Sequence, residues 1–183
     1  MVMYVILGVA VVLILWAVST YNSLVSLHAF VAEAWSGIEV QLKRRFDLIP
    51  NLVETVKGYS VHEKTVLENV TRMRSLVQNA GTVSEKIEAE AGLGQALKTL
   101  FAVAENYPDL KANVNFLRLQ DEIAKIEHEL QLSRRYYNGA ARNYNVMMRQ
   151  FPSNIVAGIA GFKSSPYFEV SSAQERETPK VQF

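Results

Sequence analysis

The sequence predicts an all-α membrane protein, in which an N-terminal single transmembrane helix continues into an antiparallel helical bundle with long, coiled-coil-like helices. Three observations predict this fold class. The first 18 residues contain no charged side chain. Beyond them, apolar residues recur at steps of three and four, the spacing of a helix that buries one face. Late in the chain this spacing holds for roughly five heptads. We expect an anchor at 1–21, a helical bundle at 22–163 and a mostly flexible tail at 164–183.

The N-terminal apolar run, from about Val2 to Thr20, is long enough to cross a bilayer. About 20 residues in a helix span the ~30 Å hydrocarbon core. A cleaved signal peptide is the alternative interpretation, but such a peptide carries a basic segment before its apolar run, and no Lys or Arg precedes this one. Lys43, Arg44 and Arg45 follow the run. The positive-inside rule then favours a short N-terminus outside and a cytoplasmic C-terminal domain over a periplasmic one.

Four long helices are expected along the chain. Thr82 and Glu85 form a capping-box pattern, which opens the third helix, and Pro152 ends the fourth. A short apolar stretch, Ile155 to Phe162, follows. It is too short to span a bilayer, and it either rests at the membrane interface or caps the open end of the bundle. The expected helices cover about 2–58, 62–78, 83–106 and 116–151.

Composition and motifs exclude several function classes. Lys plus Arg number 19 and Asp plus Glu 18, whereas nucleic-acid binders are usually strongly basic. The chain has no cysteine, which excludes disulfides and thiolate metal sites. Its three histidines stand in no metal-binding motif, and it has neither a phosphate-binding loop nor a nucleophile elbow. We therefore expect no catalytic residue, no metal, no cofactor and no nucleic-acid partner.

A row of arginines is the first candidate for a functional surface. Arg135, Arg142 and Arg149 are spaced seven residues apart, so they share one face of the last long helix. The row is either an ordinary solvated face or a basic face near the membrane that contacts anionic lipid headgroups.

Three polar residues of the first helix are the second candidate. Gln41, Arg45 and Asp47 interrupt an otherwise apolar region. Polar groups in such a place pair inside a bundle, fix the register of its helices or line a contact between subunits. The pattern does not choose between these roles.

Sequence segments spread over nearly the whole chain resemble those of the LemA family. The resemblance implies a bacterial membrane protein with a short extracellular N-terminus and a helical bundle inside the cell. It implies no activity and no catalytic residues, because the molecular function of the family is itself unclear, although some members take part in building magnetosome membranes. The segments that carry the resemblance are Tyr21-Asn22, Glu33-Ala34-Trp35-Ser36, Gln41 to Arg45, Asp47 to Val53, Val56 to Tyr59, His62-Glu63, Tyr107 to Ala112, Leu119-Gln120, Tyr137-Asn138, Tyr144-Asn145, Phe151-Pro152, Gly161-Phe162, Tyr167 to Glu169 and Pro179 to Phe183.

The leading hypothesis is a non-enzymatic membrane scaffold or interaction protein. Its partners would be membrane lipids, further copies of itself in a homo-oligomer, and a membrane protease or an envelope-stress component. One alternative is a lipid-binding module that uses the arginine row. The other is an enzyme or metal-binding protein that uses carboxylates outside any motif, namely Glu33, Glu39, Asp47 and Glu54.

Overall fold

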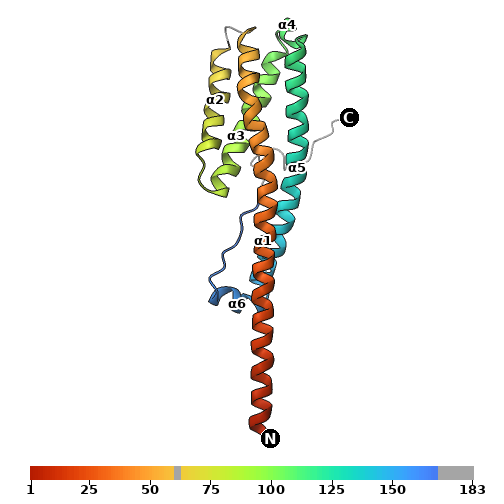
Figure 1. The fold of residues 1–183 in the computed structure, drawn as a ribbon. Coiled ribbons are helices and arrows are strands. Elements are labelled where there is room, and N and C mark those ends of the chain that lie inside the picture. The colour runs from red at the N-terminus through yellow and green to blue at the C-terminus, as the bar shows by residue number, and fades with distance from the viewer. Residues whose placement is uncertain (60–62, 169–183) are drawn as a thin grey trace, which may run out of the picture. The chain divides into compact units, whose positions relative to one another are not determined.

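The computed structural model describes residues 1–59 and 63–168, and over these residues the chain forms helices and no strand, as the sequence predicts (Figure 1). The helices are joined by short turns, apart from a connection at residues 58–63 whose middle lies outside the described residues. Their bounds are α1 Val2–Lys57, α2 Lys64–Asn79, α3 Val83–Ala104, α4 Pro108–Lys111, α5 Val114–Arg149 and α6 Ser153–Ile159.

The first helix, α1, is one uninterrupted helix of 56 residues. Its N-terminal part is long and apolar enough to cross a membrane, and the rest of the described chain buries none of its most apolar window. Pro50 lies inside the helix. The apolar N-terminal part therefore supports membrane anchoring, and the same helix continues without a break into the folded part of the chain.

The other helices follow the predicted pattern with one addition. The capping box is present, because the Thr82 hydroxyl accepts from the Glu85 backbone N–H and the Glu85 carboxylate accepts from the Thr82 N–H. The backbone N–H groups of Gly81 and Thr82 donate to the Glu85 carboxylate at 2.8 and 3.0 Å and hold the pKa of Glu85 below its usual value. The addition is the short helix α4, Pro108–Lys111, which lies between the predicted helices 83–106 and 116–151. Proline is well suited to the first turn of a helix, where its missing N–H costs nothing, and Pro108 begins α4.

By internal contacts the chain divides into two compact units, and α1 and α5 each contribute to both. The first unit comprises Met1–Glu39 and Gln131–Tyr167. Its buried side chains come mainly from α1 and α5, where Leu24 and Ile38 on α1 and Tyr137 and Tyr144 on α5 are at most 1% exposed. The second unit contains Val40–Leu130 together with Phe168.

The core of the second unit is a continuous apolar cluster supplied by five helices. Helices α2 and α3 form an antiparallel hairpin joined at Ala80–Thr82, and both contribute to the cluster. The fully buried side chains of the cluster are Ile49, Leu52, Val56, Val70, Leu93, Leu100 and Leu110. Burial of this kind is the main stabilising term of a helical bundle.

The chain turns sharply after α6. Gly161 has a φ of +73°, the left-handed conformation that glycine adopts without steric cost. The N–H of Phe162 donates to the carbonyl of Ala157 at 3.1 Å, which closes the C-terminus of α6 in a Schellman-type turn. Of the predicted tail, residues 164–168 are described and have no regular secondary structure, and residues 169–183 lie outside the described part. The predicted domain boundaries at residues 21 and 163 stay predictions.

Candidate functional site

Arg45 lies in the core of the second unit at a position that an apolar residue would normally take. On α1 it is preceded by buried Leu42 three residues earlier and followed by buried Ile49 four residues later. Its side chain is 4% exposed. An isolated charge in such a place costs several kcal/mol, so the guanidinium needs partners of opposite charge.

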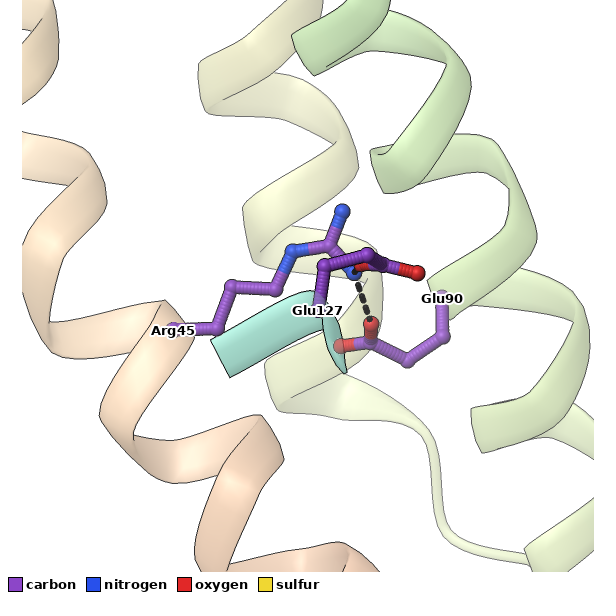
Figure 2. A network of polar contacts seen from close by, with 3 residues as sticks. All are labelled: Arg45, Glu90 and Glu127. Carbon is purple, nitrogen blue, oxygen red and sulfur yellow. Dashed lines mark hydrogen bonds and ion pairs between the residues drawn. The ribbon is translucent and has the colours of Figure 1, made fainter. Parts of the chain in front are cut away.

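Two carboxylates from other helices supply those partners (Figure 2). Nη1 of Arg45 lies 3.2 Å from Oε2 of Glu90 on α3 and 3.2 Å from Oε2 of Glu127 on α5. The Glu90 side chain is 1% exposed and that of Glu127 is 36% exposed. We call these three residues the Arg45 cluster. A Cβ added at Gly94 would lie 3.4 Å from Nη2 of Arg45, so the guanidinium lies directly against the α3 backbone.

The Arg45 cluster acts on the arrangement of the helices. Glu90 has no direct access to solvent, so the pair is not placed to bind or attack a dissolved substrate. Buried ion pairs add little net stability, but any sliding of α1 past α3 or α5 would separate charges in the core. A buried charge is known to fix register in this way in helical assemblies.

Gln41 and Asp47, which the sequence grouped with Arg45, lie elsewhere. Gln41 is half-buried and accepts a hydrogen bond from exposed Arg44 at 3.2 Å. Asp47 is exposed and lies 3.5 Å from Lys43, one turn away on the same helix. The structure brings neither into the Arg45 cluster, and their role at a contact between subunits stays a prediction.

A second polar contact joins α1 to α2 at Pro50. Proline has no N–H, so the carbonyl of Phe46, four residues earlier, loses its helical donor. Nε of Arg74 on α2 donates to this carbonyl at 3.2 Å. The same guanidinium lies over the Phe46 ring, 3.7 Å from its centroid. Arg74 therefore replaces the hydrogen bond that the proline removes.

The first unit contains a different polar device, which we call the tyrosine–asparagine clamp: Tyr137, Tyr144 and Asn145, all buried on α5. The hydroxyl of Tyr137 donates to the backbone carbonyl of Pro166 at 2.8 Å, and the hydroxyl of Tyr144 donates to the backbone carbonyl of Lys163 at 3.0 Å. The Asn145 amide both donates to the carbonyl of Ser165 and accepts from its N–H, each at 2.9 Å. Burial raises the pKa of both tyrosine hydroxyls above its usual value.

Aromatic contacts set how α1 and α5 are paired in the first unit. The ring centroids of His28 and Tyr144 are 5.3 Å apart, and those of Trp35 and Tyr137 are 5.5 Å apart. Between the two contacts each helix advances by seven residues in opposite directions. The two helices are therefore antiparallel with a matched heptad register.

This pairing places the predicted arginine row. All three arginines are exposed. If the register of the ring contacts is continued at 1.5 Å per residue, Arg149, Arg142 and Arg135 lie level with points of α1 about 5, 15 and 25 Å beyond Thr20. The row thus runs away from the apolar part of α1. Arg149 is therefore the member of the row nearest to the candidate span, and Arg135 is the farthest from it.

Sequence reasoning missed the two carboxylate partners of Arg45. Glu90 stands three residues after buried Ile87 and three before buried Leu93, so its place on an apolar face was a usable signal. Glu127 follows buried Ile126 and gave no such signal. Across residues 1–59 and 63–168, no three His, Asp or Glu side chains gather as metal ligands would, so Glu33, Glu39, Asp47 and Glu54 form no such group.

Comparison with known proteins gives one consistent result. The sequence model of the LemA family matches residues 34–183. Among curated proteins the chain is similar to magnetosome protein MamQ 2 of Paramagnetospirillum magneticum, with 26% identity over 179 residues, 84% of this chain and 66% of the relative. It is also similar to MamQ of Magnetospirillum gryphiswaldense, with 23% identity over 88% of this chain and 70% of that protein. Protein LemA of Metamycoplasma hominis is 27% identical over 84% and 70% of the two chains. The chain thus spans just under two thirds of the first relative.

Removing the guanidinium of the Arg45 cluster should destabilise the second unit strongly. Arg45→Ala leaves the Glu90 carboxylate in the core without the cation it faces, which costs about 3–5 kcal/mol and lowers the Tm by about 10 °C. Thermal unfolding of the full-length protein in detergent, followed by far-UV circular dichroism, measures the loss.

Arg44→Ala is the matched control, because Arg44 is the exposed neighbour and its guanidinium donates to Gln41 on the same helix. It should change stability by less than about 0.5 kcal/mol. The double variant Arg45→Met/Glu90→Leu should recover most of the loss, since it removes both buried charges. Equal Tm values for Arg45→Ala and Arg44→Ala would show that the Arg45 cluster does not contribute to the stability of the second unit.

Breaking the tyrosine–asparagine clamp should loosen the first unit. Asn145→Ala removes two hydrogen bonds to Ser165 and should cost about 1–3 kcal/mol in chemical denaturation. Asn145→Asp keeps an acceptor for the Ser165 N–H but sets a buried carboxylate oxygen against the Ser165 carbonyl, so it should cost at least as much as Asn145→Ala. Asn143→Ala, at an exposed position two residues away, is the control and should be close to neutral. If the two alanine variants unfold at the same denaturant concentration, the clamp is not stabilising.

Proposed function

The chain belongs to the LemA family, and from that premise we propose that it is a non-enzymatic, membrane-anchored scaffold. Its helical units would associate with further copies of the chain or with a partner protein at the membrane. The names of the similar proteins, LemA and MamQ, are not names of enzymes. They describe no molecular activity, so the proposal rests on the build of the chain.

The observation that carries the proposal is the continuity of α1. One helix supplies both the candidate membrane span and a core-forming face in each unit. A flexible linker would let a domain move freely above the bilayer, whereas a continuous helix couples the anchor mechanically to the fold that follows it. Such coupling suits a protein whose task is to hold a surface at a membrane.

The use of the polar residues supports the same proposal. The Arg45 cluster, the Arg74 contact and the tyrosine–asparagine clamp all satisfy charges or backbone groups within the chain. These contacts hold helices and a backbone segment in place. Two of the similar proteins are named as magnetosome proteins, and this supports the proposal of a task at a membrane.

We further propose that the bundle faces the cytoplasm. Arg149 and Lys163 are exposed in the same unit as the span, and both fall near its C-terminal end. Cytoplasmic leaflets carry anionic lipids, which attract such residues. A membrane protease or an envelope-stress component on that side is the kind of partner that we propose beside self-association.

The mass of the intact assembly tests the scaffold proposal. Full-length protein, extracted in mild detergent with its anchor in place, should give a discrete homo-oligomer by native mass spectrometry and light scattering. Its stoichiometry should not change when the detergent concentration is raised, which separates assembly from shared micelles. A monomer that also recovers no partner after cross-linking in cells would contradict the proposal.

The second candidate is a lipid-binding module, favoured by the exposure of the arginine row. Arg149 is the arginine of the row nearest to the candidate span, so Arg149→Gln should reduce retention of anionic lipid by about five-fold, the effect of one cation near a charged surface. Arg135→Gln, about 20 Å farther along the helix, should have no effect. Native mass spectrometry of the lipid that remains bound measures both. Equal losses from the two variants would mean that the whole row binds lipid.

A further inference from the structure

The helix α6 presents its large apolar side chains outward. Phe151 just before it, and Ile155 and Ile159 within it, are 77%, 52% and 85% exposed. Ile155 and Ile159 are four residues apart, so they share one side of α6, and Phe151 stands in the turn just before the helix. We call these three residues the docking face. Outside the candidate span, isolated exposed apolar residues need no explanation, but two on one side of a short helix with a third just before it form a patch.

The opposite side of α6 packs on the protein through small residues. Ser153 is 8% and Ala157 is 3% exposed, and the Ser153 hydroxyl lies 2.6 Å from the carbonyl of Met147 and 2.8 Å from that of Gln150. A segment that capped the bundle would bury its largest apolar residues and expose its small ones. The observed arrangement is the reverse, so the docking face is directed at something other than the core of the unit.

The end of α6 is tied to the end of the candidate membrane span. The turn at Gly161 brings the Phe162 ring to 5.8 Å from the ring of Tyr21 on α1 and 6.4 Å from that of Tyr144 on α5. Tyr21 directly follows the apolar run, at the level where aromatic residues sit in a bilayer interface. Figure 1 shows α6 lying across the direction of α1, within the same unit. An α6 so placed lies at the depth of the membrane surface.

The charge around the docking face fits an anionic lipid surface. Exposed Arg149 precedes it and exposed Lys163 follows it. From Gln131 to Phe168 the chain has four arginines and one lysine but no aspartate or glutamate. The same face of a second copy would bring the same positive charge to this surface and be repelled by it, whereas anionic headgroups would be attracted.

We infer that α6 is an interfacial helix, whose docking face lies in the boundary between headgroups and acyl chains of the same bilayer that α1 spans. Interfacial helices bury an apolar side about 5–10 Å into this boundary while basic residues reach the headgroups. The chain would then contact the membrane at two places, and the second contact would fix the tilt and rotation of α1. This inference requires α1 to span the bilayer but does not require the scaffold proposal, so each can fail without the other.

The absence of cysteine makes a direct test possible. Ile159→Cys in the full-length protein is labelled with an environment-sensitive fluorophore and reconstituted into vesicles of phosphatidylcholine and phosphatidylglycerol. Bromine atoms on the lipid, placed near the headgroup end of the acyl chain, should quench the probe by at least about two-fold, and bromine atoms near the methyl end should quench it much less. Ile155→Cys repeats the measurement in case a label at one position disturbs α6.

Leu132→Cys is the matched control, because Leu132 is apolar, 45% exposed and on α5 of the same unit, well away from α6. It should not be quenched at either depth. The inference is overturned if the α6 probes behave like the Leu132 probe, or if bromine near the methyl end quenches them as strongly. It is also overturned if their signal follows protein density and not lipid bromine, because the docking face would then contact another copy of the chain.

Discussion

The helix α1 has to keep its backbone hydrogen-bonded both in the candidate membrane span and in the folded part that follows it. The remaining structure depends on this constraint. Inside a bilayer no water is available, so every backbone group must be paired within the helix. The apolar part of α1 meets this requirement, and its only proline, Pro50, comes well after it. There the carbonyl that loses its donor, on Phe46, is reached by Arg74 from α2. A helix-breaking residue is thus tolerated where another protein segment can repair the ladder.

The Arg45 cluster and the tyrosine–asparagine clamp each hold a part of the long helices in one arrangement. Long helices with regular heptads can slide against each other by a turn at little cost in apolar contact. In the second unit the Arg45 cluster penalises such sliding electrostatically. In the first unit the tyrosine–asparagine clamp holds a backbone segment without secondary structure, whose polar groups would otherwise be costly to bury. Both devices contribute more to the uniqueness of the arrangement than to its total stability.

Local sequence patterns predicted the elements well, because helix formation depends on spacing that a single chain displays. The five-heptad spacing predicted α5, and Thr82 and Glu85 predicted the start of α3. What the patterns could not supply was pairing between helices. In the sequence Glu90 is one charged residue in a helix, and its role as the partner of a buried ion pair is visible only when Arg45 is placed opposite. The place of Arg135 along α1, far from the candidate span, likewise follows from the contact of Trp35 with Tyr137. Neither relation has a signature within one segment.

The ring contact of Trp35 with Tyr137 also bears on how the chain is made. The two residues are separated by about a hundred positions in the sequence. At a synthesis rate of roughly 5–20 residues per second, the partner of α1 in the first unit emerges about 5–20 seconds after α1 itself. The hairpin of α2 and α3 joins neighbouring segments and can form well within that interval. The face of α1 that packs against α5 therefore stays uncovered during this time, and the order of synthesis delays the closure of the unit that contains the candidate span.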